Sequence, residues 1–161
     1  MFHPTKNTLS ETVRQNVVTI LNQQLVNLLD LQLQTKQAHW NVRGPHFIGL
    51  HELFDKINDE VREFVDEVAE RVSALGGVAL GTVQEVNSKT KLKAYDINAV
   101  SCRQHIELLS TALATTSDGT RKSVDALDEA GDKISSDLMT GITAGLDQKL
   151  WFVEAHLHAK D

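Results

Sequence analysis

The sequence has little of what several common protein classes require. Cysteine occurs once among 161 residues, at Cys102, which excludes a fold held together by disulfides. No apolar run approaches the roughly 18 residues of a membrane-spanning helix, so no membrane partner is expected. The first residues contain no apolar stretch of the secretory kind. These absences predict a cytoplasmic protein, with an association with the nucleoid left open.

Proline and the signals of β-strands are also scarce. Proline occurs only at Pro4 and Pro45, and the aromatic content is 5%. Without further prolines after Pro45, the chain can form long helices, and alternating β-branched segments are missing. We therefore predict an all-α protein in which residues 1–161 form one domain, with short tails at 1–8 and 158–161.

Apolar residues recur at the helical period in the first half of the chain. A first helix is expected from a capping box formed by Thr8 and Glu11 to about Trp40. Its apolar stripe is wide enough for two buried contacts rather than one. A second helix is expected over 47–75, where Gly76 and Gly77 follow and stop it.

The second half predicts a long connection and two more helices. Residues 78–95 form a crossover with a short helical piece at Val83–Lys89, and Asp96 is the expected N-cap of the third helix. Whether that helix continues through Gly119 is left open. The fourth helix follows Gly131 and Asp132. A long link between the second and third helices is the connection of a ferritin-like four-helix bundle.

The net charge of −6 is unevenly distributed along the chain. Residues 51–71 contain eight acidic and three basic side chains, a net charge of −5, so the rest of the chain is close to neutral. This acidic balance argues against a generic nucleic-acid binder. Either the second helix has a solvated charged face, or a cation binds there.

Two pairs of side chains at i,i+4 spacing could each offer two ligands to a metal ion. They are His51 with Asp55, and Asp66 with Glu70, and all four fall outside the predicted core. Imidazole and carboxylate together suit Fe, Zn or Mn. Asp55 and Asp66 lie roughly 16 Å apart along one helix, too far to share an ion. A second copy packed antiparallel about a two-fold axis would bring the pairs together, with His39 as a candidate to complete the first half.

The simpler interpretation, a charged helix face that is only solvated, is about equally compatible with these spacings. The Glu-x-x-His motif of di-iron sites inside a bundle is absent at every glutamate. If this chain binds iron, the site is therefore expected outside the bundle interior.

Several short segments carry a family resemblance. They are HWN, HELFD, DEVAER and GGVALGT, all between Lys36 and Thr82, and LDQKLWFVEAHL near the C-terminus. With them, nearly the whole chain resembles the Dps family, the mini-ferritins named for DNA protection during starvation. Members of that family assemble as hollow dodecamers that hold iron mineral. The resemblance implies a ferroxidase that oxidises Fe(II) with hydrogen peroxide or oxygen.

The resemblance also implies roles for individual residues. The iron ligands correspond to His39, His51 and Asp55 of one subunit and to Asp66 and Glu70 of its two-fold mate. Trp40 matches a tryptophan beside that centre. Asp132 and Asp137 are candidates for acidic iron-entry pores, although acids near a helix N-terminus are equally well explained by the helix dipole.

Two alternatives and several residues stay open at this stage. The protein could be an architectural nucleoid protein, but the tail MFHPTKN holds a single lysine, and we expect weak or no direct DNA binding. Zinc could compete with iron for a His and carboxylate site. No function falls on Cys102, His156 or His158.

Overall fold

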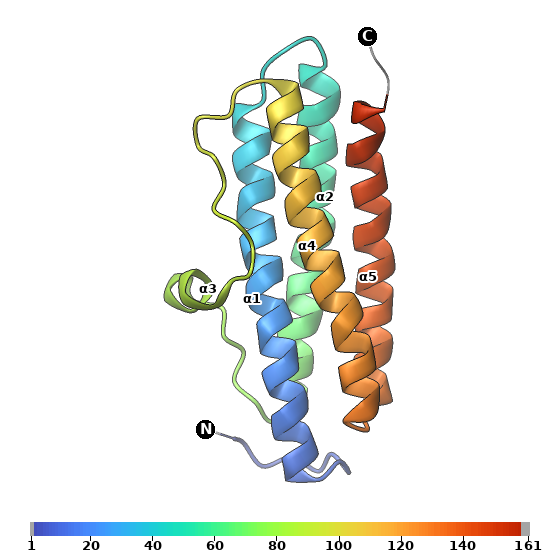
Figure 1. Ribbon diagram of the computed structural model, residues 1–161. Coiled ribbons are helices and arrows are strands. Elements are labelled where there is room, and N and C mark those ends of the chain that lie inside the picture. Colours follow the sequence, from blue (N-terminus) through green and yellow to red (C-terminus); the bar gives the residue numbers. More distant parts are fainter. Residues whose placement is uncertain (1, 159–161) are drawn as a thin grey trace.

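The computed structural model describes residues 2–158, which form helices joined by short turns and one long connection. The elements are α1 (Glu11–Asn41), α2 (Phe47–Ala74), α3 (Val83–Lys89), α4 (Cys102–Glu129), α5 (Lys133–Glu154) and a final 3₁₀ helix, η1 (Ala155–Leu157) (Figure 1). Within 2–158 the β-structure is limited to one isolated bridge between Arg43 and Ser101. Of the predicted tails, residues 1 and 159–161 lie outside the described residues.

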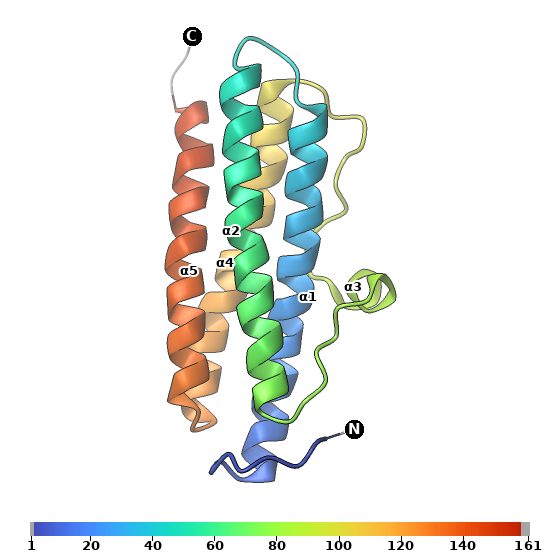
Figure 2. The same ribbon diagram turned by 180° about the vertical axis from the view of Figure 1, so that it is seen from behind.

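The four long helices form two antiparallel hairpins, α1 with α2 and α4 with α5. The connection that carries α3 runs along the outside of α1 and returns the chain to the end of the bundle where α2 began (Figures 1 and 2). As a result α2 and α4 run in the same direction. The predicted all-α, ferritin-like bundle with a short helix in its long crossover is confirmed, down to the bounds of α3.

Two predicted helix starts are wrong by a few residues. Helix α1 is capped by Ser10, whose hydroxyl accepts from the Val13 N–H, rather than by Thr8. Helix α4 is capped by Ser101 in a capping box with Gln104, whereas Asp96 accepts from the Asn98 N–H in a local turn. Aspartate favours both environments, because its carboxylate bonds the backbone two or three residues on.

The third long helix is continuous through the Thr- and Gly-rich segment at 115–120. The hydroxyls of Thr115 and Thr116 donate to the carbonyl groups four residues earlier, which keeps these side chains compatible with the helix. Gly119 faces α1, because a Cβ there would lie 3.0 Å from Gln24 Oε1 on that helix. The open question about Gly119 is thus answered by a close approach of α1 and α4.

The apolar core lies between the four long helices, and α1 is its central member. Helix α1 contacts α2, α4 and α3, which accounts for the width of its apolar stripe. The largest fully buried side chains are distributed over all four long helices and the turn after α2. They are Leu21, Leu25, Leu28, Leu31, Leu50, Phe54, Ile57, Leu75, Leu109, Leu113, Leu127 and Met139. No helix within 2–158 is both long and apolar enough to cross a membrane.

The N-terminal segment is packed against the end of the α1–α2 hairpin. The His3 N–H donates to the Gly76 carbonyl at 2.7 Å, and Arg14 donates to the Leu75 carbonyl at 2.8 Å. The Arg14 guanidinium also lies over the Phe2 ring. These contacts hold the tail on the protein from its second residue onward.

An ion pair joins the end of α2 to the turn between α4 and α5. Arg71 donates to both carboxylate oxygens of Asp132 at 2.9 and 2.8 Å and to the Ser135 hydroxyl at 2.9 Å. Asp132 is almost fully buried and also caps α5 by accepting from the Ser135 N–H. Burial alone would raise the pKa of Asp132, but hydrogen bonds from Ser135 and Arg71 outweigh it and lower that pKa below its ordinary value.

Candidate metal centre

His39 and His51 meet where α1 ends and α2 begins. Their rings are stacked with centroids 3.7 Å apart, and each ring uses Nδ1 to bind the other residue's carbonyl oxygen, at 2.8 and 2.9 Å. A carbonyl oxygen can only accept, so Nδ1 carries the proton in both rings. The lone pair of each Nε2 is therefore available, and both rings are held in the tautomer that binds metals.

Asp55 lies one turn further along α2, beside the two imidazoles. Its Oδ1 is 3.9 Å from His39 Nδ1 and forms an ion pair with the ammonium group of Lys36 on α1. The hydrogen bond from Lys36 lowers the pKa of Asp55, so the carboxylate is charged at neutral pH. His39, His51 and Asp55 thus form a compact group of three potential ligands, one of which is occupied by a lysine.

Asp66 and Glu70 lie on the same helix but far from this group. Both side chains are exposed, and neither forms an ion pair or hydrogen bond with residues 2–158. The rise of an α-helix places Asp66 roughly 16 Å from Asp55. Within residues 2–158 no group of three or more His, Cys, Asp and Glu side chains is arranged to hold a metal ion, and this includes His39, His51 and Asp55, whose carboxylate is paired with Lys36.

Other residues singled out from the sequence fall in varied places. Trp40 follows His39 and is 62% exposed, and Asp137 is exposed on α5. Asp132, by contrast, is buried, and both of its oxygens bind Arg71. Cys102 is buried with its thiol directed to the Arg43 carbonyl, and His156 binds the Phe152 carbonyl one turn back on the C-terminal helix.

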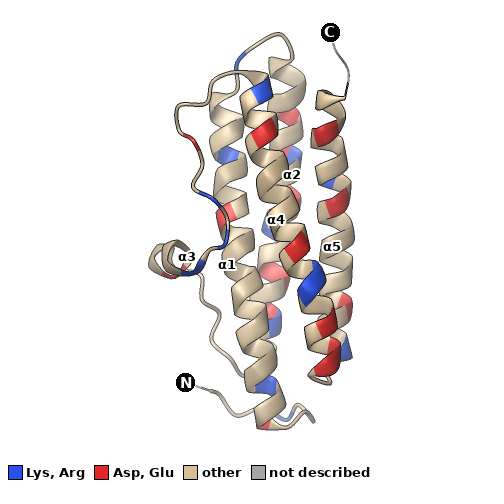
Figure 3. Cartoon of the chain, viewed as in Figure 1, with Lys and Arg blue, Asp and Glu red and all other residues tan. Residues whose placement is uncertain are grey.

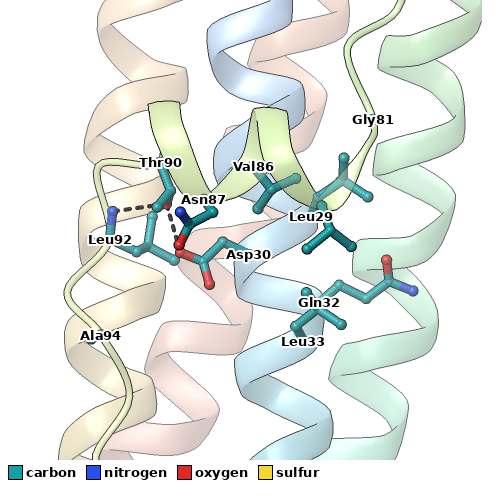
Figure 4. A pocket seen from close by; sticks show the side chains of 11 residues that line it. Leu29, Asp30, Gln32, Leu33, Gly81, Val86, Asn87, Thr90, Leu92 and Ala94 are labelled. Atoms are coloured by element: carbon teal, nitrogen blue, oxygen red, sulfur yellow. Dashed lines mark hydrogen bonds between the residues drawn. The ribbon is translucent and has the colours of Figure 1, made fainter.

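A groove of about 680 Å³ lies between α1 and the connection that carries α3. Figure 4 shows Leu29, Leu33, Val86 and Leu92 lining it together with Asp30, which accepts from the Thr90 hydroxyl. The groove contains no histidine or cysteine, so it is distinct from the metal-binding group. It leaves apolar surface on α1 uncovered, since Leu33 is 61% exposed.

Charge is distributed very differently over the helices. Only four of the 31 residues of α1 are Lys, Arg, Asp or Glu, whereas charged side chains recur along α2, α4 and α5 (Figure 3). Helix α1 is thus nearly free of charge on the side where Leu33 and Trp40 are exposed. An exposed apolar surface next to an incomplete ligand set is typical of an interface between subunits.

Comparison with known proteins first identifies the class of protein to which this chain belongs. Residues 18–160 match the model of the Ferritin family, a ferritin-like domain. Among curated proteins, the chain is 44% identical to a DNA protection during starvation protein of Agrobacterium fabrum, over 98% of each chain. It is 35% identical to one of Mycolicibacterium smegmatis, over 94% of this chain and 82% of the relative.

Solved structures agree with this class. The Mycobacterium smegmatis Dps structure in its tetragonal form has a TM-score of 0.93 at 34% identity and covers 99% of this chain and 96% of its own. DpsC from Streptomyces coelicolor has a TM-score of 0.95 at 28% identity and covers 100% and 94%. The chain belongs to the Dps family of ferritin-like proteins.

Sequence reasoning missed Lys36. The residue lies three positions before His39 on α1, a spacing that places both side chains on one helix face, and this spacing was the available signal. Its ion pair shows that a lysine competes with any cation for Asp55.

We therefore predict that Lys36→Met strengthens metal binding. Removing the ammonium group leaves Asp55 unpaired, and a unit charge at contact distance in a solvent-exposed site changes affinity roughly five-fold. Calorimetric titration of the assembled protein with Zn(II), a redox-inert probe, would measure the gain.

Lys89→Met is the matched control, because it removes a lysine–carboxylate pair, with Glu85, on α3. Unchanged or weaker Zn(II) binding in Lys36→Met would show that Lys36 does not compete for the site.

Proposed function

We propose that this protein is a ferroxidase and iron-storage mini-ferritin. It oxidises Fe(II) with hydrogen peroxide, or with oxygen, at centres shared between two subunits. The Fe(III) product is stored as mineral in a hollow dodecamer. Because Fe(II) and peroxide are removed together, hydroxyl radicals do not form, and DNA is protected chemically. Family membership supports the general role, and the ligand geometry supports the centre.

The observation that carries the proposal is the pair of crossed His39 and His51 hydrogen bonds. The two imidazoles, each with a free Nε2 lone pair, and the Asp55 carboxylate beside them supply half of the donor set that suits Fe(II). Half of a coordination shell at the protein surface cannot hold the ion within one chain. Asp66 and Glu70, unpaired and on the same helix, are the complementary half.

The positions of the four α2 ligands fit a two-fold axis. His51 lies as many residues before the Glu60–Val61 peptide as Glu70 lies after it, and the same holds for Asp55 and Asp66. An antiparallel α2 of a second subunit, centred at that peptide, places both pairs opposite each other at once. One such dimer has two identical centres. Leu33 and Trp40 on α1 are apolar and exposed, which supports burial of this side of the α1–α2 hairpin in the dimer.

The chemistry follows from the donor set. Imidazole nitrogens and carboxylates bind Fe(II), and hard carboxylates favour the Fe(III) that forms. Peroxide accepts two electrons from two Fe(II) ions, its O–O bond breaks, and with two protons it yields two waters. Three carboxylates and two imidazoles are few ligands for two ions, so one iron position is held weakly. Zn(II) fits the same donors and would compete without reacting.

The shared centre can be tested with two inactive variants. His51→Ala with Asp55→Ala removes one half, and Asp66→Ala with Glu70→Ala removes the other. Each assembly should lose the fast Fe(III) absorbance phase after anaerobic Fe(II) loading and peroxide addition. Random 1:1 mixed assembly should restore about one quarter of the wild-type centres, because every mixed two-fold dimer has one intact site and one doubly altered site.

A site inside one chain would give no recovery on mixing, and a monomeric wild type would exclude the proposal. Size measurement of each assembly is the control, since it separates loss of ligands from loss of oligomerisation.

We further propose that Asp137, exposed on α5, lines the route by which Fe(II) enters. Asp132 was an equal candidate from the sequence, but its burial and its pairing with Arg71 favour a structural role. The two residues form a matched pair. Asp137→Asn should slow iron uptake at unchanged stability, measured by stopped-flow absorbance and thermal unfolding. Asp132→Asn should instead reduce stability by about 3 kcal/mol, because it leaves Arg71 unpaired.

Equal uptake rates in wild type and Asp137→Asn would exclude an entry role for Asp137. Slow uptake in Asp132→Asn at wild-type stability would place the entry route at Asp132 after all.

We expect no tight direct binding to DNA. The N-terminal segment has one lysine, and it is held on the bundle by the His3 N–H bond to Gly76 and by the contact of Phe2 with Arg14. Twelve copies at −6 each would carry a net charge of roughly −72, which repels DNA. A gel shift at low salt and neutral pH should show no retention. Stoichiometric retention of DNA there would favour the architectural role.

A further inference from the structure

Tyr95 and His105 form a hydrogen-bonded pair that the metal centre does not use directly. The Tyr95 hydroxyl lies 2.7 Å from His105 Nδ1, and the two rings are nearly parallel. Tyr95 belongs to the long connection, and His105 is on the first turn of α4. His105 is 1% exposed, so its ring is shielded from water.

The surroundings of His105 define its protonation. The carbonyl oxygens of Asn41 and Ala99 lie beside the ring as acceptors, and Nε2 is buried without a hydrogen bond of standard geometry. With its proton on Nε2, the ring accepts the Tyr95 O–H at Nδ1. Burial lowers the pKa of His105. The two carbonyl groups raise this pKa, and the nearby Arg43 lowers it. The pair is neutral at rest, and a proton can pass from the phenol to Nδ1.

The pair is also close to the metal centre. Asn41, which His105 faces, is two residues after His39 on α1, or roughly 3 Å along the helix axis. The backbone bridge between Arg43 and Ser101 fixes the α1–α2 turn to the start of α4. In Figure 1 the end of α1, the start of α2 and the start of α4 lie at the same end of the bundle. A short, rigid path of protein atoms therefore joins Tyr95 to His39.

A centre with one firmly held iron needs a second electron. Peroxide takes two electrons when its O–O bond breaks, and a single Fe(II) supplies one. Without another donor, the one-electron reaction releases a hydroxyl radical, the product that the protein is proposed to prevent. The ion pair of Asp55 with Lys36 leaves fewer free carboxylates to hold a second iron.

We propose that Tyr95 is an internal one-electron donor to the metal centre, with His105 as the acceptor of its phenolic proton. The proposal rests on the ferroxidase function proposed above. In the step, Fe(II) becomes Fe(III) and Tyr95 becomes a neutral tyrosyl radical. Peroxide takes both electrons, its O–O bond breaks, and two hydroxide ions form. The phenolic proton moves to His105 Nδ1 and gives an imidazolium. The Asn41 and Ala99 carbonyl groups beside the ring favour this charged form.

Burial supports the need for a proton acceptor. Desolvation, with a smaller contribution from Asp96, raises the pKa of Tyr95 well above its ordinary value. The phenol is therefore protonated at rest, and oxidation must release a proton. His105 is the only ionisable side chain that forms a hydrogen bond with the Tyr95 hydroxyl among the described residues.

The composition of the chain makes the test unambiguous, because Tyr95 is its one tyrosine. The assembled protein is loaded anaerobically with one Fe(II) or fewer per centre, mixed with hydrogen peroxide and freeze-quenched for electron paramagnetic resonance. The wild type should show a tyrosyl radical, which Tyr95→Phe should abolish while preserving the ring in the packing. A spin trap should then detect several-fold more hydroxyl radical from Tyr95→Phe than from the wild type.

Two further variants separate the roles. His105→Gln keeps a hydrogen-bond acceptor but cannot hold the proton, so it should diminish the tyrosyl signal and slow its appearance. Trp151→Phe, at an exposed position whose ring contacts Phe152, should leave the signal unchanged. A wild-type tyrosyl signal of equal size and rate in His105→Gln would exclude His105 as the proton acceptor.

The Fe(III) absorbance of the same samples distinguishes the two proposals. Rapid Fe(II) oxidation by peroxide without a tyrosyl signal, or with a tryptophan radical alone, would overturn the role of Tyr95 and leave the ferroxidase function intact. Absence of Fe(II) oxidation in the wild type would overturn both.

Discussion

The distance that a straight helix imposes between its residues is the constraint on which the proposed site depends. Asp55 and Asp66 are roughly 16 Å apart on α2, so the carboxylates that suit one iron centre cannot meet within a chain. The ligands are instead arranged symmetrically about the Glu60–Val61 peptide, where a two-fold axis would bring them together. In the proposed centre, catalysis and assembly would be coupled, since a subunit alone holds only half of the ligands.

The ligands of the proposed centre that lie in one chain are oriented before any metal binds. His39 and His51 fix each other through backbone carbonyl groups, so their orientation does not rely on a bound ion. Lys36 neutralises Asp55 until a cation replaces it. Rigid imidazoles and an exchangeable carboxylate are properties suited to a site through which iron passes as substrate, rather than one that retains a metal permanently.

Much of the fold followed from patterns that act locally. The period of the apolar residues predicted four long helices, and the short helical piece predicted at Val83–Lys89 coincides with α3, which Thr82 caps. The errors arose where two residues competed for one role. Ser10 and Ser101 cap their helices in place of Thr8 and Asp96, and the Asp96 carboxylate instead accepts from the Asn98 N–H in a local turn. Gly119 was ambiguous until the position of Gln24 on α1 was known.

The sequence by itself determined the class of the protein and the chemistry of the candidate ligands, because helical periodicity and metal preference depend on residue types and their spacing. Only the tertiary structure decided which polar groups face each other. It showed that Lys36 pairs with Asp55, that Arg71 binds both oxygens of Asp132, and that Tyr95 reaches His105. The partners in the second and third pairs are separated by 61 and 10 residues and lie on different elements, so no spacing rule connects them.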